Sequence, residues 1–183
     1  MKVLHLGCGR VGHAIKIDGM TECVTLDADP LLRPDLVCKL GAAPIAMPDN
    51  SVDLAIAIHV LEHIGIQGDT MEWFAFWEEL YRVLKPDGKI QFESPLYSSV
   101  WAWSDPSHTR ALSPLSFVFF SQDSYRIKTS GISPYRVKCD FTPLRFEFLK
   151  DGDPKTQAID NGRSHFRGVL QAKKPFRGWW EDQ

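Results

Sequence analysis

Short, mostly apolar runs recur along the chain, each bounded by glycine, proline or polar residues. They are KVLHL (2–6), TECVTL (21–26), DLVCKL (35–40), VDLAIAI (52–58) and KIQFE (89–93). Runs of this kind are typical of buried strands, and strands separated by crossover segments favour a parallel sheet that is covered on both faces. The sequence therefore predicts an α/β fold.

One helix is predicted between the fourth and fifth runs. Its apolar residues recur at helical spacing at Phe74, Trp77, Tyr81 and Leu84. The segment DTME (69–72) precedes them and has the form of a capping box, with an oxygen acceptor at the N-cap and a carboxylate three residues later. The segment PDG (86–88) is expected to end the helix.

The end of the chain has a different pattern. YRVKCDFTPLRFEFL (135–149) and SHFRGVLQAK (164–173) are predicted to be longer strands that pair as an antiparallel edge, with Gly152, Pro154 and Gly162 in the loop between them. We see no repeat and no linker-like boundary. We therefore expect a single doubly wound domain over residues 1–183, with a mostly parallel, seven-stranded sheet that ends in a C-terminal antiparallel hairpin.

Composition limits the cellular setting and the partners. No apolar run approaches the ~20 residues that a membrane helix needs, and the start, MKVLHLGCGRVG, lacks the apolar stretch of a signal peptide. We expect a cytoplasmic protein with no membrane partner. The four cysteines are scattered without a CxxC pair, which predicts small core residues rather than a disulfide framework or a cysteine metal site.

Charge is distributed unevenly. Residues 1–124 carry an excess of Asp and Glu, and residues 125–183 carry an excess of Lys and Arg. A basic C-terminal third suits an anionic substrate or a nucleic acid. The alternative is an ordinary solvated face of a strand-rich segment.

The first run ends in Gly7-Cys8-Gly9, where the lack of a side chain lets backbone N–H groups approach a ligand closely. Asp27 follows Gly9 by 18 residues and ends the second run. A carboxylate there can accept hydrogen bonds from both hydroxyls of a ribose held over the glycine turn. The alternative is a turn aspartate before Pro30. We favour the nucleoside site, because both features occur together.

With these features in place, the chain resembles a class I, Rossmann-like S-adenosylmethionine-dependent methyltransferase of the small-molecule branch. Four stretches carry the resemblance, in family order: VLHLGCGRVG (3–12), VTLDADP (24–30), MPDNSVDLAIAIHVLEHI (47–64) and ELYRVLKPDGKIQFESP (79–95). They lie between residues 3 and 95, a span of about half of the chain. The resemblance implies a cofactor-binding part over residues 1–95 and a substrate side over residues 96–183.

The resemblance also implies a set of cofactor-binding residues. Gly7, Cys8 and Gly9 would pack under the amino acid moiety of S-adenosylmethionine. Asp27 would bind the ribose, with Ala28 beside it. Leu40 would lie near the adenine, and Ile58 and His59 would border the methionine end.

The chain departs from the family pattern at several positions. His5 stands where the family usually has an acid, Val11 where it has a third glycine, and Lys39 near the place of an adenine-binding Asp. The segment GHAIKIDGM (12–20) is also too short for a full first helix. These departures bear on cofactor affinity rather than on the fold.

The string HVLEH (59–63) matches H-x-x-E-H, a zinc-peptidase signature. That chemistry needs His59 and His63 one turn apart on a sustained helix. Here His59 follows a predicted strand directly, and Gly65 and Gly68 interrupt any helix that begins. We therefore expect the match to be coincidental and predict no metal site.

The segment VWAWSDPSHTRALSP (100–114) follows the fifth run and is expected to lie beside the methyl donor, since ligands bind beyond the carboxyl ends of parallel strands. Trp101 and Trp103 are candidates for the apolar walls of an acceptor-binding site. Asp105 and Arg110 are candidates for polar contacts with the substrate. His108 is the candidate general base. The alternative is that these residues have structural roles. Asp105 would cap a turn at Pro106, His108 would support the loop, and Trp101 and Trp103 would fill the core.

The sequence thus predicts an enzyme that transfers a methyl group from S-adenosylmethionine to a small or modest-sized acceptor. One alternative is a nucleic-acid methyltransferase, for which the basic tail KKPFRGWW (173–180) offers tryptophans that can stack on bases. The other is a non-catalytic cofactor-binding or protein-interaction module. The sequence does not specify the acceptor or the oligomeric state.

Overall fold

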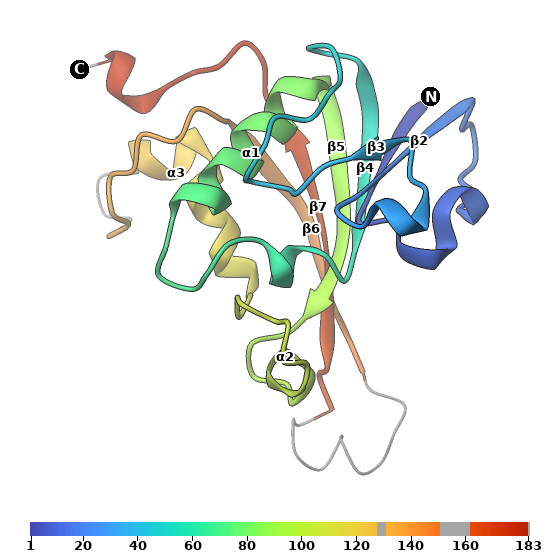
Figure 1. Ribbon diagram of the computed structural model, residues 1–183. Coiled ribbons are helices and arrows are strands. Elements are labelled where there is room, and N and C mark those ends of the chain that lie inside the picture. The colour runs from blue at the N-terminus through green and yellow to red at the C-terminus, as the bar shows by residue number, and fades with distance from the viewer. Residues whose placement is uncertain (128–130, 151–161, 183) are drawn as a thin grey trace.

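The computed structural model describes residues 1–127, 131–150 and 162–182. Seven strands form one twisted sheet in the order β3-β2-β1-β4-β5-β7-β6 (Figure 1). The strands are β1 (Lys2–Leu6), β2 (Glu22–Asp27), β3 (Leu36–Val37), β4 (Val52–Ile58), β5 (Leu84–Pro95), β6 (Phe141–Leu149) and β7 (His165–Ala172). β1 to β5 pair in parallel, and β7 runs antiparallel to both β5 and β6. The predicted α/β sheet with its C-terminal antiparallel pair is confirmed.

Among the described residues, three α-helices and five 3₁₀ segments accompany the strands, and the last of them follows β7. The helices are α1 (Met71–Val83), α2 (Trp101–Ser104) and α3 (Gln122–Arg126). The 3₁₀ segments are η1 (Gly9–Ala14), η2 (Pro30–Leu32), η3 (Leu61–His63), η4 (Pro114–Phe120) and η5 (Trp179–Asp182). Within the described ranges, none of these helices combines the length and the apolar character that crossing a membrane requires.

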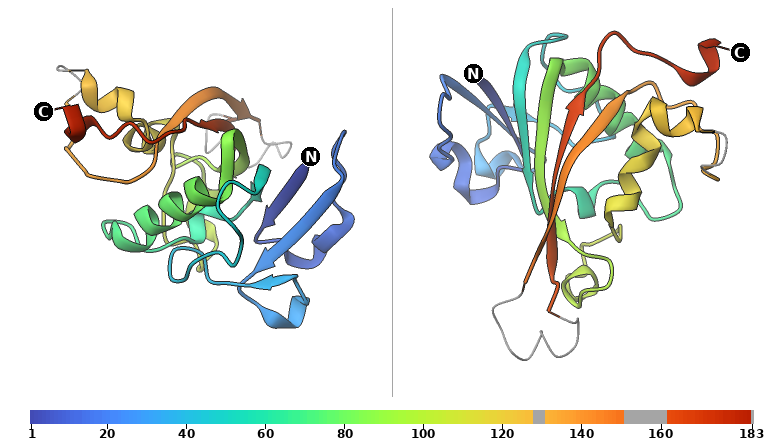
Figure 2. Two further views of the ribbon diagram at one scale, coloured as in Figure 1. Left: turned by 90° about the horizontal axis from the view of Figure 1, so that it is seen from above. Right: turned by 180° about the vertical axis from the view of Figure 1, so that it is seen from behind.

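The main core lies between one face of the sheet and a layer built by α1, η4 and α3 (Figures 1 and 2). α1 buries Trp73, Phe76, Trp77 and Leu80 on its inner side. The Trp77 ring stacks on Phe120 of η4 with 4.6 Å between ring centroids. Aromatic contacts of this kind stabilise a core beyond the area that they bury, so they fix α1 and η4 against the sheet.

The opposite face has a thinner cover near β1 and β4. Val3, Leu54 and Ile56 form a small second cluster, against which Ile15 and Ile17 pack. These two isoleucines follow η1, which takes the place of a first crossover helix and is kinked at Gly12, where φ is +51°. The sequence prediction that this crossover is too short for a full helix is confirmed.

β3 is shorter than its predicted range of 35–40. The Asp35 carboxylate accepts hydrogen bonds from the Thr25 backbone N–H at 2.7 Å and from the Thr25 hydroxyl at 2.8 Å. A side chain therefore takes this backbone donor at the start of β3. At the other end, a turn in which the Ala42 N–H donates to the Lys39 carbonyl at 3.1 Å leads the chain out of the sheet. Only Leu26↔Leu36 and Asp27↔Val37 remain as strand partners.

The predicted capping box at the start of α1 is wrong. Thr70 is the N-cap and makes no side-chain cap, whereas the Asp69 carboxylate accepts the Met71 N–H at 2.9 Å. Glu72 forms an ion pair with Lys39 at 3.3 Å instead of folding back onto the helix start. α1 also ends earlier than predicted, because Leu84 already pairs with Val52 as the first residue of β5.

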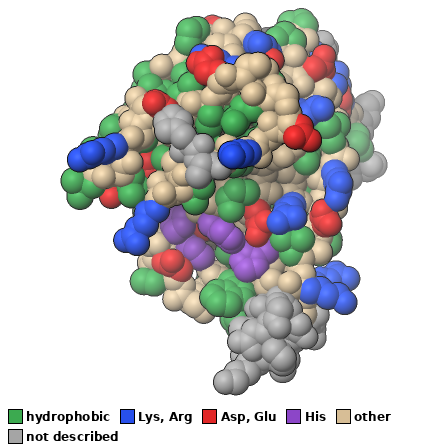
Figure 3. Space-filling view, turned by 90° about the vertical axis from the view of Figure 1, so that its right-hand side faces the viewer, with side chains coloured by type: hydrophobic (Ala, Val, Ile, Leu, Met, Phe, Trp, Pro, Cys, Tyr) green, Lys and Arg blue, Asp and Glu red, His purple; other side chains and the backbone are tan. Residues whose placement is uncertain are grey.

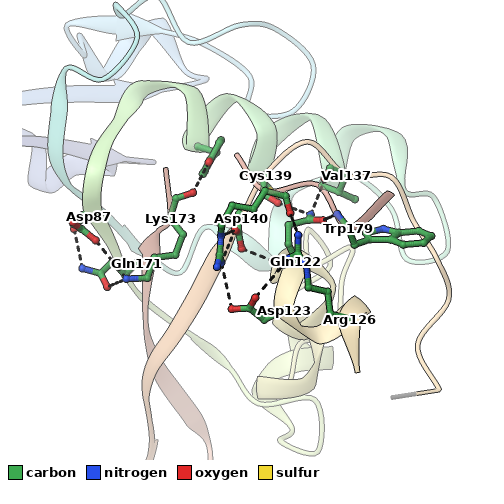
Figure 4. A network of polar contacts seen from close by, with 12 residues as sticks. Asp87, Gln122, Asp123, Arg126, Val137, Cys139, Asp140, Gln171, Lys173 and Trp179 are labelled. Atoms are coloured by element: carbon green, nitrogen blue, oxygen red, sulfur yellow. Dashed lines mark hydrogen bonds and ion pairs between the residues drawn. The ribbon is translucent and has the colours of Figure 1, made fainter. Parts of the chain in front are cut away.

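The C-terminal tail is attached to the core by a polar network (Figure 4). Gln122 donates to the carbonyls of Val137 and Cys139 at 3.1 and 2.8 Å and accepts the Trp179 N–H at 3.0 Å. Arg177 pairs with the fully buried carboxylate of Asp140 at 2.7 Å. The basic tail therefore packs against the protein through its own polar groups.

Candidate active site

A hollow of about 380 Å³ lies at the carboxyl ends of β1 to β4. We call it the cofactor hollow. Its lining comes from the turns that follow four parallel strands, which is the place where open α/β sheets bind ligands. The lining residues are Gly7, Leu26, Asp27, Ala28, Cys38, Lys39, Leu40, His59, Val60, His63 and Ile64.

The glycine turn after β1 forms one wall of the cofactor hollow. Gly7 and Gly9 adopt φ values of +55° and +53°, a left-handed conformation that glycine reaches without steric cost. A Cβ at Gly7 would lie 2.5 Å from a methyl carbon of Val60. Both the backbone conformation and this close approach explain why glycine follows β1 at this position.

Asp27 stands at the end of β2 and joins that strand to the glycine turn. Its carboxylate accepts hydrogen bonds from the N–H groups of Gly9 at 2.9 Å and Asp29 at 3.0 Å. A carboxylate has about four lone-pair positions, so capacity is left for ligand hydroxyls. Asp27 itself lines the cofactor hollow.

The end of β4 separates the cofactor hollow from a second cavity. His59 has a φ of +54°, and its N–H donates to the Glu93 carbonyl at 3.0 Å. The chain turns here, so Val60 faces the glycine turn and His63 follows within η3. His59 and His63 line both cavities.

The second cavity measures about 590 Å³, and we call it the acceptor pocket. Four histidines from three parts of the chain meet in it, and Figure 3 shows histidine side chains gathered in one patch. The lining residues are His59, His63, Pro95, Trp101, Ser104, Asp105, Pro106, His108 and His165. The predicted Trp101, Asp105 and His108 are thus brought together beside the end of β4.

A buried carboxylate lies beneath this pocket. Glu62 is 1% exposed, and its Oε2 accepts the Ser94 hydroxyl at 2.6 Å. His59 Nδ1 lies 3.3 Å from Glu62 Oε1, and this contact, supported by Glu93, raises the pKa of His59 against the opposing effect of burial. Burial alone would raise the pKa of Glu62, but His59 and Ser94 together hold it below its usual value. The site therefore favours a charged pair.

Some predicted residues lie elsewhere. Trp103 lines a different hollow of about 1130 Å³, and its Nε1 donates to the Tyr97 carbonyl. Arg110 is buried, donates to the carbonyls of Ile64, Ile66 and Asp69, and lies over the Trp73 ring. Arg110 thus holds the loop between η3 and α1.

Three predicted cofactor residues are outside the described lining of the cofactor hollow. Cys8 is buried and its N–H donates to the Leu26 carbonyl, while Gly9 contacts Asp27. Ile58 is exposed and lines a hollow on the opposite face of the sheet, together with Glu93 and Arg167. Cys8 and Gly9 support the turn from outside the cavity.

The peptidase-like string has no peptidase geometry. His59 lies after the end of β4, and only Leu61–His63 forms a 3₁₀ turn before Gly65, where φ is +67°. His59 and His63 are therefore not carried one turn apart on a sustained helix. The string instead forms the turn that follows β4, and its two histidines line the two cavities.

Sequence reasoning missed three residues in or beside the acceptor pocket. Glu62 and His63 stood inside the HVLEH string, which was considered only as a helical zinc motif. His165 carried no local signal, since it reaches the pocket through the antiparallel pairing of Pro95 with His165. That pairing depends on the register of β7 against β5.

Comparisons with known proteins agree with this geometry. A family model described as a methyltransferase domain matches residues 4–92. The match covers just under half of the chain and, with the shared fold described below, indicates a class I, Rossmann-like S-adenosylmethionine-dependent methyltransferase.

Solved structures of such methyltransferases share its fold. One from Archaeoglobus fulgidus is 19% identical, with 93% of this chain and 85% of that chain covered and a TM-score of 0.64. One from Mesorhizobium loti is 14% identical, with coverages of 93% and 90% and a TM-score of 0.58. The N-methyltransferase NodS from Bradyrhizobium japonicum, in complex with S-adenosylhomocysteine, is 12% identical, with coverages of 93% and 77% and a TM-score of 0.59. A search of curated protein sequences finds no significant match.

S-adenosylmethionine is accordingly the cofactor of this methyltransferase. The cofactor hollow fits such a ligand by its chemistry: a glycine turn, a strand-end carboxylate with free acceptor capacity, and an apolar wall that includes Leu26, Leu40 and Ile64. Its volume of about 380 Å³ lies within the usual range for small-molecule sites.

Proposed function

We propose that this methyltransferase transfers a methyl group to a small acceptor held in the acceptor pocket. The observation that carries the proposal is that the two cavities share His59 and His63 as lining residues. A cofactor in one cavity and an acceptor in the other would meet at the end of β4. Methyl transfer depends mainly on holding the acceptor atom close to and in line with the methyl group.

On the cofactor side, we assign the ribose to Asp27, with Ala28 beside it, and the adenine surroundings to Leu40. Gly7, Cys8 and Gly9 form and support the turn under the amino acid moiety. His59 follows β4 and borders the methionine end, whereas Ile58, the last residue of β4, positions His59 from outside the cofactor hollow. When bound, the cofactor supplies an electrophilic methyl group on a sulfonium. The chain's own part is to hold that group at the mouth of the acceptor pocket.

On the acceptor side, Trp101 supplies an apolar wall, and Asp105 and His108 supply polar contacts. His108 is mostly buried, with 10% of its side chain exposed, and its Nε2 lies 4.0 Å from both Glu62 Oε1 and Asp105 Oδ2. An imidazole so placed can receive a proton from an acceptor. Trp103 and Arg110 support this region from outside the pocket.

A nucleic-acid acceptor is less well supported by the tail. Trp179 stacks on Tyr125 with 5.8 Å between ring centroids, and Trp180 packs on Phe176 at 5.5 Å. Lys174 donates to the carbonyls of Arg82 and Leu84, and Arg177 pairs with Asp140. The groups that would stack on bases or neutralise phosphates are thus engaged within the fold.

Calorimetric titration with S-adenosylmethionine and S-adenosylhomocysteine tests the cofactor assignment. We expect micromolar binding by the wild type and a loss of about 1.5–3 kcal/mol in Asp27→Ala, the range for hydrogen bonds to a charged group. Asp29→Ala is the matched control, because Asp29 accepts the Leu31 N–H and is not among the described residues that line the hollow. Equal losses in both variants, or no binding by folded wild type, would contradict the assignment.

Formation of S-adenosylhomocysteine then tests the acceptor class. Panels of small oxygen- and nitrogen-bearing acceptors are compared with short oligonucleotides at equal cofactor concentration. Turnover on a small molecule that His108→Ala reduces without changing cofactor affinity supports the proposal. Turnover on oligonucleotides alone would replace it with the nucleic-acid alternative.

A further inference from the structure

Three side chains with metal-binding atoms meet at the floor of the acceptor pocket. Glu62 and His63 come from η3, and His108 comes from the loop after α2. One ligand atom from each lies within 4.8 Å of the other two. The histidine patch in Figure 3 lies on this side of the molecule.

Glu62 carries the strongest indication of a ligand. The residue is 1% exposed, and its Oε1 accepts no hydrogen bond, although His59 Nδ1 lies 3.3 Å away. Its other oxygen is held by the Ser94 hydroxyl at 2.6 Å. Buried carboxylate oxygens are normally paired, because leaving one without a partner is costly. Oε1 is in ion-pair contact with His59 but accepts no hydrogen bond from a described residue, so this fixed, buried oxygen still has lone-pair capacity for a cation.

The two histidines are oriented as metal ligands usually are. His63 Nδ1 lies 3.1 Å from the Ser107 carbonyl, and His108 Nδ1 lies 3.4 Å from the Ala102 carbonyl. A carbonyl accepts hydrogen bonds, so in the neutral imidazole each Nδ1 carries the proton and each Nε2 offers its lone pair to a metal. A backbone carbonyl behind the imidazole is the common outer-shell partner of a metal-binding histidine. His108 Nε2 lies 4.0 Å from Glu62 Oε1.

We propose that Glu62, His63 and His108 bind a divalent first-row transition metal ion. Two imidazoles and one carboxylate suit zinc, iron, cobalt or nickel better than magnesium or calcium, which prefer oxygen ligands. Ligand atoms at ~2.1 Å from a metal lie ~3–3.5 Å apart, so binding would draw the three side chains together. This set differs from the peptidase motif, in which both histidines of the string bind the metal and the glutamate acts as a base. Here His59 is not a ligand, and Glu62 and His108 are.

The place of the ion also suggests what it does. His63 and His108 line the acceptor pocket, so coordination positions without a protein ligand would face the acceptor. The ion would then hold an oxygen-bearing acceptor beside the methyl donor and favour loss of its proton. This role would replace that of His108 as the base, because the lone pair of His108 Nε2 would be used to bind the ion. This role rests on the proposed function, whereas metal binding itself does not.

Metal binding is measured on the full chain after treatment with EDTA and dialysis. We expect one Co²⁺ or Zn²⁺ per chain by calorimetry, with a visible Co²⁺ absorption band that Zn²⁺ abolishes. Glu62→Gln keeps an acceptor oxygen for Ser94 but replaces the ligand oxygen with an amide, and His108→Ala removes a ligand. Each is expected to weaken binding by at least ~10-fold. Thermal unfolding of the metal-free variants confirms that they are folded.

His165→Ala is the matched control, because His165 lines the same pocket but is not one of the three ligands. It is expected to bind Co²⁺ like the wild type. No stoichiometric binding by the wild type, or equal affinities in Glu62→Gln and the wild type, would overturn the proposal. So would a loss in His165→Ala as large as that in His108→Ala. Cofactor titration in EDTA reports on the proposed function separately.

Discussion

At the scale of single residues, Gly7 has two separate reasons to be glycine. Its φ is +55°, and a Cβ would lie 2.5 Å from Val60 Cγ2. Gly9 has nearly the same φ, +53°, but among the described residues no atom lies within 4 Å of the position that a Cβ would take. Gly7→Ala and Gly9→Ala therefore share the conformational cost and differ by the clash. We expect Gly7→Ala to lower the free energy of unfolding by about 1–3 kcal/mol more than Gly9→Ala, the range for overpacking.

Urea unfolding without cofactor measures this difference. The double variant Gly7→Ala/Val60→Ala is expected to lose less than the sum of its single variants, since truncating Val60 makes room for the added methyl group. Equal stabilities of Gly7→Ala and Gly9→Ala would mean that Val60 moves aside freely. Close packing against Val60 would then play no part in fixing the turn.

At the scale of elements, Asp53 joins three strands at the start of β4. Its carboxylate accepts the Lys2 N–H of β1 at 2.7 Å and pairs with Lys85 of β5 at 2.8 Å. The contact with Lys85, followed by that with the Lys2 N–H, lowers the pKa of Asp53. A lowered pKa in the folded state stabilises the protein above the unfolded value of about 3.9 and is lost as pH falls through the folded value.

Asp53→Asn should therefore be less stable than the wild type at pH 7, and the difference should shrink as pH falls below about 4. Both groups are partly exposed, so we expect a modest effect, about 1 kcal/mol or less. Urea unfolding at a series of pH values measures it, with the exposed Asp18→Asn as control. A difference that stays constant from pH 7 to pH 3 would show that charge at Asp53 is not responsible.

Elements with a strong local pattern were predictable from the sequence. VDLAIAI gave β4 with its observed bounds, and the glycine and aspartate at two strand ends indicated the cofactor hollow. β3 and the start of α1 were not predictable in detail. The start of β3 depends on the hydrogen bonds between Asp35 and Thr25, and Glu72 pairs with Lys39 instead of capping α1. Both are contacts between different segments of the chain, which local sequence rules do not describe.

At the scale of the whole molecule, the acceptor pocket is a product of topology. β7 brings His165 beside the end of β5, and the loop after α2 brings His108 over η3. Neither approach follows from local periodicity. The sequence could indicate that residues 100–114 lie near the methyl donor, but the grouping of four histidines required the sheet order. The same long-range pairing positions the C-terminal tail.

Arg177 holds the tail against the rest of the protein by pairing with Asp140, which lies just before β6. Asp140 is fully buried and also accepts the Gln122 N–H at 3.1 Å. Arg177→Gln would leave this carboxylate with too few donors. Because Arg177 is 43% exposed, we expect a loss of about 1.5–3 kcal/mol in the free energy of unfolding, less than for a fully buried pair.

Arg145→Gln is the matched control, because Arg145 pairs with Glu147 on the exposed surface, where such pairs contribute below about 1 kcal/mol. The double variant Arg177→Gln/Asp140→Asn should recover part of the loss, since it removes the uncompensated buried charge. Urea unfolding followed by tryptophan fluorescence measures all variants, with limited proteolysis of the tail as a second readout. If Arg177→Gln is no less stable than Arg145→Gln, the ion pair does not hold the tail, and its cations would be free to bind an anionic partner.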